Sequence, residues 1–287
     1  MSRVALATCR IAVPGADLPG ANPDVDAPLL LTALHDRGIT ATLEVWDDPD
    51  VDWDQFDAVV VRSTWDYTSR REEFLSWARA RSFILNPYEM LEYSSDKHYL
   101  VDLAERGVDV VETRVVEVGE TASFFDVDVV VKPAIGAGSA DAARYSVEEE
   151  AGARAHVSDL HRQNRAALVQ PYVDSVDSRG ERALVFIGGE FSHALTKAAM
   201  LNTPAEFRDA TFRRAQMSGA NAEPAALDLA RRALEPFADA LYARVDLVES
   251  DGEWRVMELE LVEPNLFFAF GEGAADRFAD ALFARLR

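Results

Sequence analysis

Short runs of apolar residues divide the first third of the chain into alternating strands and helices. The predicted strands cover residues 3–8, 39–45, 56–61 and 83–85. Between the first two strands, Asp26 is placed to cap a helix whose apolar stripe ends at Gly38. A second helix is predicted over residues 70–81. Strands that alternate with helices in this way predict an α/β lobe with a parallel sheet.

The pattern changes after residue 92, where strand-like segments outnumber helices. Residues 94–96 open a predicted helix that runs to Arg106 and is closed by Gly107. The strand-like segments that follow are residues 110–118, 127–132, 167–173, 183–187 and 190–196, with one helix near 147–164. This order predicts an α+β region rather than a continuation of the first lobe.

The last third of the chain is predicted to form a helix, a hairpin and a closing helix. These segments are a helix over 224–241, strands over 243–248 and 253–261 joined by an Asp-Gly turn at 251–252, and a helix over 274–286. No internal repeat or low-complexity segment interrupts the chain. We therefore expect three consecutive lobes, which cover residues 1–92, 93–175 and 176–287.

The chain is acidic, with 50 Asp and Glu residues against 29 Lys and Arg and a formal net charge of −21. A surface of this charge repels nucleic-acid phosphates and anionic membranes, so neither is an expected partner. Cys9 is the only cysteine, which excludes an intramolecular disulfide and a zinc site built on several thiolates. No apolar run reaches the length of a signal peptide or a membrane span. These features predict a cytoplasmic protein, and a homodimer stays open.

Only three of the 29 basic residues are lysines, namely Lys97, Lys132 and Lys197. A chain that otherwise uses arginine retains lysine where a compact point charge on a flexible stem is needed, as beside a phosphate. Chance is the alternative explanation for so small a number.

An apolar strand at residues 129–131 leads directly to Lys132, and then to a loop of small residues that contains Gly136, Gly138 and Ser139. Such a strand fixes a lysine beside the α- and β-phosphates of a nucleotide, and glycines let backbone N–H groups approach the phosphate oxygens. The segment lacks the Gly-Lys-Ser/Thr ending of a Walker A loop and the Gly-x-Gly-x-x-Gly fingerprint. A glycine-rich hairpin with a surface lysine is the alternative interpretation.

Two predicted strands near the C-terminus carry acidic residues at alternating positions. Alternation places Asp246 on one face of the first strand, and Glu258 and Glu260 on one face of the second. If these strands form a hairpin, the three carboxylates converge. Hard oxygen ligands without histidine or thiolate suit Mg²⁺ that is bound to a nucleotide. A solvated acidic hairpin is the alternative, although like charges on one face repel unless a cation neutralises them.

The order and spacing of these features resemble the ATP-grasp superfamily over nearly the whole chain. The matching positions are Asp96-Lys97 at a helix start, Lys132 with the flap from Gly136 to Ser139, the interlobe segment 168–173, the pair Gly180-Glu181, the basic residue Lys197, and Asp246 twelve positions before Glu258. The resemblance implies a Rossmann-like N-terminal lobe followed by two α+β lobes that clasp ATP. It implies further nucleotide contacts from Lys97, Gln170, Tyr172, Val173 and Glu181.

One position departs from the family pattern, because Glu260 stands where ATP-grasp proteins usually have asparagine. A literal Glu-x-Asn occurs slightly later, at Glu263 and Asn265. The spacing from Asp246 favours Glu258 and Glu260 as metal ligands, with Glu263 and Asn265 as reserve candidates. The resemblance implies two magnesium ions.

Three segments resemble one branch of this superfamily. Residues 61–67, 192–197 and 258–264 are similar to the O-ureidoserine cyclo-ligases that make D-cycloserine, and to uncharacterised relatives of these enzymes. The branch implies an ATP- and magnesium-dependent ligase that forms a carbon–nitrogen bond on a small amino-acid-like substrate through a phosphorylated intermediate. Ring closure of an O-ureidoserine-like compound is one such reaction.

Phosphoryl transfer depends on positioning and charge neutralisation, so basic residues are expected to supply most of the catalysis. Under the ATP-grasp interpretation, Lys97 and Lys132 hold the α- and β-phosphates. Lys197 and Arg244 then stabilise the moving γ-phosphoryl group. A carboxylate or ureido oxygen of the substrate is phosphorylated, and an amine displaces the phosphate.

Substrate recognition is expected from loops at the carboxyl ends of the first-lobe strands, residues 8–10 and 62–65. Arg62 is a candidate partner for a substrate carboxylate, and a structural salt bridge is the alternative for this residue. Cys9 and His193 are interpreted as buried structural residues rather than catalytic groups.

Two other functions stay open. A peptide or amino-acid ligase of the glutathione synthetase or ribosomal-protein glutamate ligase kind would use the same nucleotide site. A catalytically silent nucleotide-binding regulator would bind ATP without turnover, and the retention of all three lysines and the three carboxylates argues against it.

Overall fold

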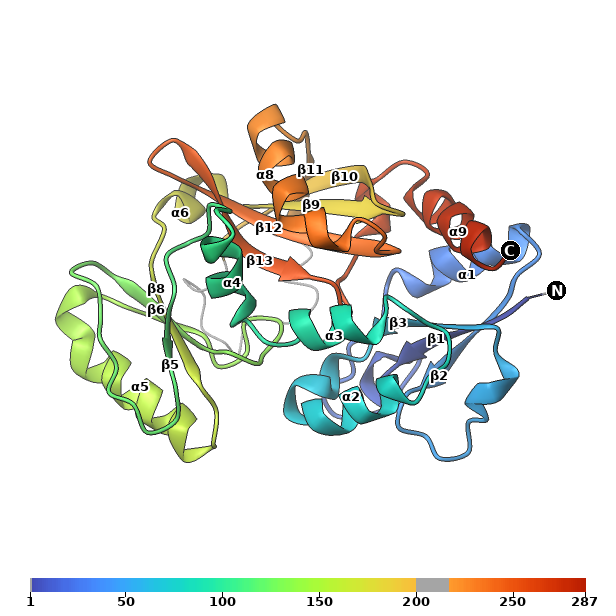
Figure 1. The fold of residues 1–287 in the computed structure, drawn as a ribbon, viewed down its shortest axis with the longest axis horizontal. Coiled ribbons are helices and arrows are strands. Elements are labelled where there is room, and N and C mark those ends of the chain that lie inside the picture. The colour runs from blue at the N-terminus through green and yellow to red at the C-terminus, as the bar shows by residue number, and fades with distance from the viewer. Residues whose placement is uncertain (1, 200–216) are drawn as a thin grey trace.

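Three β-sheets form the framework of the protein, one in each third of the chain (Figure 1). The computed structural model describes residues 2–199 and 217–287. Within these two ranges, no helix is both long and apolar enough to cross a membrane. The sheets and the helices that cover them match the α/β and α+β organisation that the sequence predicts.

The first sheet is parallel throughout, as the alternation of strands and helices predicts. Its order is β2-β1-β3-β4, with β1 at Arg3–Thr8, β2 at Thr40–Val45, β3 at Ala58–Ser63 and β4 at Ile84–Leu85. Every residue of β3 is buried, which accounts for its unbroken apolar run. Because β1 and β3 are parallel neighbours, the loops that follow them meet at one edge of the sheet.

Three helices follow the strands of this sheet, namely α1 at Ala27–Asp36, α2 at Arg71–Arg79 and α3 at Tyr88–Ser94. The predicted cap of α1 is wrong, because Asp24 Oδ1 rather than Asp26 accepts the N–H of Ala27, at 3.2 Å. Asp26 instead accepts three backbone N–H groups of residues 266–268. The start of α1 is therefore tied to a loop near the C-terminus.

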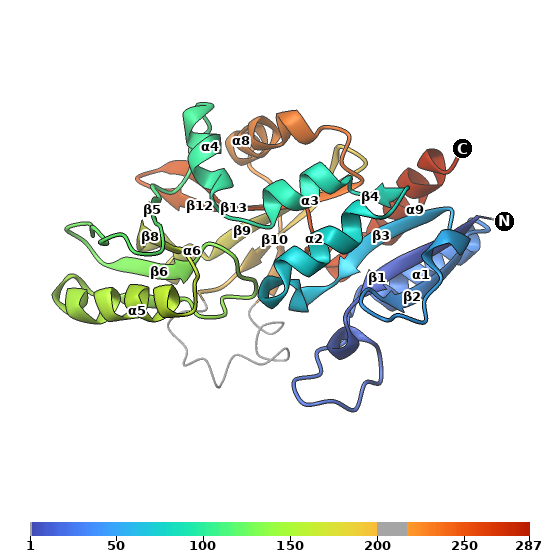
Figure 2. The same ribbon diagram turned by 60° about the horizontal axis from the view of Figure 1, so that its bottom comes forward.

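The second sheet is antiparallel and is covered on one face by a helix (Figure 2). Its order is β5-β8-β6-β7, with β5 at Arg114–Val116, β6 at Val129–Pro133, β7 at Ala143–Tyr145 and β8 at Ala167–Pro171. The covering helix, α5 at Glu150–Arg162, buries Ala153, Val157 and Leu160. The strand predicted over 110–118 is reduced to β5, and the short strand β7 was not predicted.

The helix predicted to open at residues 94–96 begins later, since α4 spans Tyr99–Glu105. Ser94 instead ends α3, and its hydroxyl donates to the carbonyl of Leu259 and accepts the N–H of Leu261, both at 2.9 Å. Tertiary hydrogen bonds therefore use the side chain that the sequence suggested as a cap.

The third sheet is antiparallel and lies between the other two (Figures 1 and 2). Its order is β11-β10-β9-β12-β13, with β9 at Glu181–Ile187, β10 at Glu190–Lys197, β11 at Met217–Ala220, β12 at Tyr242–Ser250 and β13 at Glu253–Glu260. The helices of this region are α6 at Ser175–Arg179, α8 at Pro224–Leu234 and α9 at Ala274–Arg285. The predicted hairpin is confirmed, because β12 and β13 pair with Asp246 opposite Glu258 and Arg244 opposite Glu260.

The first and last helices of the chain pack side by side (Figure 1). Leu30 and Leu34 of α1 share one apolar core with Phe278 of α9. Arg37, just after α1, reaches Asp280 with its Nε atom 2.5 Å from Oδ1. The N-terminal lobe therefore completes its core with residues from the end of the chain.

The three predicted lobes each contain one sheet, but their boundaries are less sharp than the sequence suggests. Helix α3 crosses the boundary at residues 92/93. Asn86 is fully buried and donates to the carbonyls of Tyr242 and Leu261, at 2.9 Å each. Its Oδ1 atom accepts the N–H of Leu241. These bonds fasten the end of β4 directly to β12 and to the end of β13.

Candidate active site

A cavity of about 600 Å³ opens where loops and strands from the three sheets meet. The loops that follow β1 and β3 contribute Asn22, Trp65 and Tyr67, and the loop that follows β6 contributes residues 136–140. The remaining wall includes residues of β9, β10, β12 and β13, Lys97 and Tyr99 from the second lobe, and the loop that follows β13. The cavity is therefore positioned to take a ligand that contacts all three lobes.

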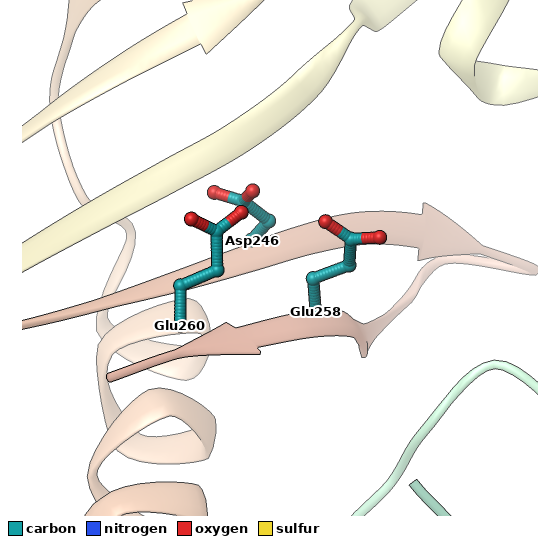
Figure 3. A group of neighbouring side chains, drawn as sticks. All are labelled: Asp246, Glu258 and Glu260. Atoms are coloured by element: carbon teal, nitrogen blue, oxygen red, sulfur yellow. The ribbon is translucent and has the colours of Figure 1, made fainter. Parts of the chain in front are cut away.

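Three acidic side chains from the hairpin of β12 and β13 point toward one another, and the two glutamates among them line the cavity (Figure 3). Carboxylate oxygens of Asp246, Glu258 and Glu260 all lie within 4.8 Å of one another. The bulge after Asp246 leaves this residue directly opposite Glu258, so both side chains project from the same face. The convergence expected from strand alternation is thus present in the structure.

Two lysines from the second lobe approach Glu258 from the other side of the cavity. Lys132, on β6, places Nζ 3.3 Å from Glu258 Oε1. Lys97 lies 3.9 Å from the same oxygen, and it donates to the carbonyl oxygen of Gly136 at 2.5 Å. One carboxylate is thus shared by two cations, and Lys97 also fixes the start of the small-residue loop.

Lys197 and Arg244 bind the other two carboxylates. Lys197 Nζ lies 2.7 Å from Asp246 Oδ2 and 2.9 Å from Glu181 Oε2. Arg244 makes two hydrogen bonds to Asp246, at 2.9 and 3.0 Å, and one to Glu260 at 2.5 Å. Each of the three carboxylates is therefore paired with at least one basic side chain.

These contacts set the protonation states of the carboxylates. Burial alone would raise the pKa of Glu258, but the charges of Lys97 and Lys132 lower it to about 2. Burial likewise opposes ionisation of Asp246, and the neighbouring cations outweigh it and lower the pKa. Burial and the nearby carboxylates raise the pKa of Glu260 to about 7, despite the opposing charge of Arg244. Asp246 and Glu258 are therefore anionic near neutral pH.

The three carboxylates fit a divalent cation that prefers oxygen ligands. They offer hard donors within 4.8 Å of one another, and no histidine or cysteine belongs to the described group. Asp246 is buried and the two glutamates are partly exposed to the cavity, so water and phosphate oxygens could complete the coordination of such an ion. The donor set suits Mg²⁺ better than zinc.

The loop after β6 contributes Gly136, Gly138 and Ser139 to the cavity wall. A second glycine position is required for tight packing. Gly180 has φ +70°, and a side chain there would meet the carbonyl oxygen of Lys197 at 2.4 Å. The absence of a side chain at Gly180 lets Glu181 and Lys197 lie next to each other.

The segment expected to hold adenine lies at the end of β8, and its side chains do not line the cavity. Gln170 is buried and donates to Thr113 Oγ1 at 2.8 Å. Tyr172 has its ring beneath the guanidinium of Arg144, 3.6 Å from the ring centre, and Val173 is buried. These side chains make structural contacts, so only the backbone of the segment is available to a nucleotide.

Of the residues predicted in the two substrate loops, Trp65 alone lines the cavity. Residues 8–10 and 62–64 do not line the cavity, whereas Trp65 does. Arg62 is buried with its guanidinium 5.4 Å from the ring centre of Tyr242, and it donates weakly to the carbonyl of Pro264 at 3.4 Å. The structure thus gives no support for a direct contact of Arg62 with substrate. Its place is inside the core, behind the loop that contains Pro264.

The structural interpretation of Cys9 and His193 agrees with their surroundings. Cys9 is fully buried, and burial is the main cause that raises the pKa of its thiol. His193 is buried, with Nε2 2.8 Å from the carbonyl oxygen of Leu266 and Nδ1 2.9 Å from Ser192 Oγ. Neither residue lines the cavity.

Sequence reasoning missed several residues of the cavity wall, notably Asn22, Tyr67 and Phe267. Tyr67 lies within the segment that resembles the cyclo-ligases, so its position there was a usable signal. Phe267 has a left-handed backbone conformation, with φ +52°, and no sequence pattern predicts this. The three N–H groups bound by Asp26 hold this turn in place.

Known proteins share both the sequence and the fold of this chain. The family model for the N-terminal domain of D-cycloserine synthetase DcsG matches residues 4–86. The cycloserine biosynthesis protein DcsG of Streptomyces lavendulae is 38% identical over 285 residues, which covers 92% of this chain and 95% of that protein. The crystal structure of D-cycloserine synthetase DcsG aligns with a TM-score of 0.88 and 34% identity, over the full length of both chains.

The fold extends to more distant proteins. The RimK domain ATP-grasp protein of Sphaerobacter thermophilus DSM 20745 aligns over 98% of this chain and 100% of that chain, with a TM-score of 0.67 and 20% identity. Other chains with this fold were solved with ATP, or with Mg and ADP.

Proposed function

Because the chain belongs to the D-cycloserine synthetase family of ATP-dependent ligases with the ATP-grasp fold, we propose that it closes the ring of an O-ureidoserine-like compound. The reaction forms a carbon–nitrogen bond on a small amino-acid-like substrate and consumes ATP. A cavity of about 600 Å³ has the size of sites that bind small molecules, which agrees with a small substrate beside the reacting part of a nucleotide.

The observation that carries this proposal is the contact between Lys132 and Glu258. It joins a basic strand of the second lobe to the acidic hairpin of the third lobe at 3.3 Å. A metal–nucleotide complex needs both charges at once, because its phosphates are negative and its metal is positive. Lys132 and Glu258 are within reach of one such complex.

The resting site is a network of ion pairs, and nucleotide binding exchanges their partners. Phosphate oxygens take up Lys97 and Lys132, and this releases Glu258 from the two lysines. Lys197 and Arg244 are placed to stabilise the γ-phosphoryl group as it moves. The positive charges are thus held in position before the ligand arrives, and little reorganisation is needed during the reaction.

Asp246, Glu258 and Glu260 would hold the magnesium, with two ions as the sequence-based expectation. Magnesium, when bound, neutralises phosphate charge and aligns the γ-phosphoryl group for transfer. Glu260 must give up its contact with Arg244 to act as a ligand. The loop with Gly136, Gly138 and Ser139 covers the phosphates through its backbone N–H groups.

Adenine would be bound by the backbone of residues 170–173, and Glu181 would contact the nucleotide from β9. The side chains of Gln170, Tyr172 and Val173 would hold this backbone in place. Arg62 would act on the substrate through the Pro264 loop that it supports, rather than by direct pairing.

Ring closure would proceed through an acyl phosphate of the substrate. An oxygen of the substrate carboxylate attacks the γ-phosphorus of ATP, which forms an acyl phosphate and releases ADP. The ureido nitrogen that is bonded to oxygen then attacks the acyl carbon, loses its proton and expels phosphate, which closes a five-membered ring. Water removes the carbamoyl group as carbon dioxide and ammonia. O-ureidoserine, ATP and water thus give cycloserine, carbon dioxide, ammonia, ADP and phosphate.

The test is to incubate the protein with Mg²⁺, ATP and the D enantiomer of O-ureidoserine, and to follow ADP by a coupled assay and the product by mass spectrometry. The expected result is equimolar ADP and cycloserine. The matched control is the same mixture with Glu258→Gln, which should form neither.

Other outcomes would replace the proposal. ADP release with pairs of amino acids, but not with O-ureidoserine, would indicate a peptide or amino-acid ligase. ATP binding without turnover on any substrate would indicate a nucleotide-binding regulator. The homodimer and the cytoplasmic location stay predictions, and sedimentation velocity would test the first.

A further inference from the structure

Some polar side chains of the cavity wall lack hydrogen-bond partners among the described residues. Glu263 and Tyr67 line the cavity, and they are only 7% and 4% exposed. Over residues 2–199 and 217–287, neither the Tyr67 hydroxyl nor the side-chain amide of Asn265 makes a hydrogen bond. The carboxylate of Glu263 is near its own backbone N–H and has no other donor in residues 2–199 and 217–287. Tyr67, Glu263 and Asn265 therefore line one cavity without a hydrogen bond to the side chain of any other described residue.

Glu263 stands apart from the metal-binding carboxylates. The described group of oxygens within 4.8 Å of one another contains Asp246, Glu258 and Glu260 but not Glu263. The reserve role of Glu263 as a metal ligand therefore gains no support from the geometry.

The basic residues of the site are committed to other carboxylates. Lys97 and Lys132 approach Glu258, and Lys197 bridges Asp246 and Glu181. Within the described part of the chain, no cation lies within 4 Å of Glu263. A buried carboxylate without a counter-charge costs free energy that an incoming cation would recover.

The pKa values of Glu263 and Tyr67 agree with a carboxylate that lacks a counter-charge. Burial, followed by the charge of Glu260, raises the pKa of Glu263 to about 8. The charge of Glu263, after burial itself, is the main cause that raises the pKa of Tyr67. Both side chains line the same cavity, where one ligand group can meet them.

We propose that Glu263, Tyr67 and Asn265 form the subsite for the protonated α-amino group of the substrate, which rests on the proposed function in taking the substrate to be an amino acid. An ammonium group has three N–H donors. The carboxylate of Glu263, the hydroxyl of Tyr67 and the Oδ1 atom of Asn265 supply three acceptors. The charge of Glu263 distinguishes an ammonium group from a hydroxyl of the same size.

This subsite also orients the substrate. Lys97 and Lys197, which line the same cavity, mark the phosphate side of the site. An amino acid held by its ammonium group at Glu263 would direct its carboxylate toward these lysines, where phosphorylation takes place. Trp65 and Phe267 supply apolar walls for the carbon chain.

The experiment compares two substrates that differ only in the amino group, O-ureido-D-serine and its des-amino analogue 3-(ureidooxy)propanoate. We expect Glu263→Gln to lower kcat/KM for the amino substrate about 100-fold, mainly through KM, because a charged hydrogen-bonded pair is lost. With the des-amino substrate, the same variant should differ from the wild type by less than about threefold. Tyr67→Phe should show the same selectivity with a smaller loss, about 5- to 10-fold.

Glu253→Gln is the matched control, because Glu253 is exposed at the start of β13 and does not line the cavity. It should behave like the wild type with both substrates. An equal loss on both substrates in Glu263→Gln would overturn the subsite and indicate a general structural effect. Thermal melting of each variant identifies misfolded protein, and Tyr67→Phe then decides the question by the same comparison.

A second measurement separates this subsite from the proposed ring closure. If the wild type releases no ADP with O-ureido-D-serine, the proposed function fails, and the subsite is tested by calorimetric binding of D-serine to the protein loaded with Mg²⁺ and a nonhydrolysable ATP analogue. D-serine should bind at least about tenfold more weakly to Glu263→Gln, and D-glycerate should bind neither protein detectably. Equal binding of D-serine to both proteins, or none to the wild type, would overturn the subsite.

Discussion

Lys132 Nζ lies 3.3 Å from Glu258 Oε1, although 126 positions separate the two residues in the chain. The contact joins β6 of the second lobe to β13 of the third lobe. Each residue also affects the pKa of the other. Glu258 opposes the lowering of the Lys132 pKa by burial, and Lys132 helps to lower the pKa of Glu258.

Glu258→Gln should abolish catalysis while it leaves the fold intact. Glutamine keeps the shape of the side chain but removes the charge that a metal ion requires. We expect substrate-dependent ADP release to fall about 100-fold or more, measured by a coupled assay at saturating Mg²⁺. Glu253→Gln should retain full activity, and near wild-type turnover of Glu258→Gln would reject the metal assignment.

Lys132→Met should weaken ATP binding more than it slows chemistry. In the proposed site the variant removes a charged hydrogen bond to a phosphate, so the KM for ATP should rise about 10- to 100-fold. Steady-state kinetics with ATP as the varied substrate gives this number. Arg231→Met removes a cation from the exposed surface of α8 and should leave the KM unchanged; an equal rise in that variant would point to a general electrostatic effect.

Nucleotide should stabilise the protein only when the metal is present. A ligand that binds only the folded state raises the melting temperature, by about 5–10 °C at concentrations 100-fold above Kd. We expect this rise with Mg²⁺ and a nonhydrolysable ATP analogue, and its loss with EDTA. Asp246→Asn should melt without the metal-dependent increment. An increment that survives both EDTA and Asp246→Asn would contradict the assignment.

Glu263 should make the stability of the ligand-free protein fall as the pH rises. Its folded-state pKa is raised from 4.5 to about 8, so protonation favours the folded state. This contribution is fully present below the unfolded-state pKa and is lost as the pH rises through about 8. In urea unfolding between pH 5 and 9, Glu263→Gln should lack this fall, which is expected to be on the order of 2–4 kcal/mol in the wild type. If the free energy of unfolding changes with pH in parallel for the two proteins, Glu263 is not the cause of the fall.

Asp26→Asn tests how the cavity wall is held. Asp26 accepts N–H groups of Leu266, Phe267 and Phe268 at 2.8–3.0 Å, and Phe267 has a left-handed backbone. Asparagine retains a single acceptor oxygen, so the free energy of unfolding should fall by about 1–3 kcal/mol in urea titrations. Asp228→Asn, on the exposed face of α8, should leave it unchanged. A stability equal to the wild type in Asp26→Asn would show that the turn does not depend on the carboxylate.

The acidic hairpin was predictable from sequence because its geometry is local. Strand alternation and an Asp-Gly turn determine which side chains of β12 and β13 share a face, and Asp246, Glu258 and Glu260 follow from these two rules. The three lysines were predictable for another reason. Their rarity in an arginine-rich chain marked them, and all three approach carboxylates of the site.

The wall of the cavity was less predictable because it depends on tertiary contacts. Arg62 was expected to contact the substrate. Its guanidinium instead packs against the ring of Tyr242, which lies 180 positions later in the chain. Asp26 was expected to cap its own helix, and the loop at residues 266–268 competes for the same oxygens. Local patterns identify which residues are polar, but they do not tell which distant segment will use them.

The packing of α9 on α1 bears on how the protein reaches its native state during synthesis. Leu30 and Leu34 are synthesised early. Their neighbour Phe278 belongs to α9, which follows every other described strand and helix in the chain. The N-terminal lobe therefore keeps this apolar face open to water until α9 has been made. A nascent chain that stops before α9 is expected to need chaperone protection and to aggregate without it.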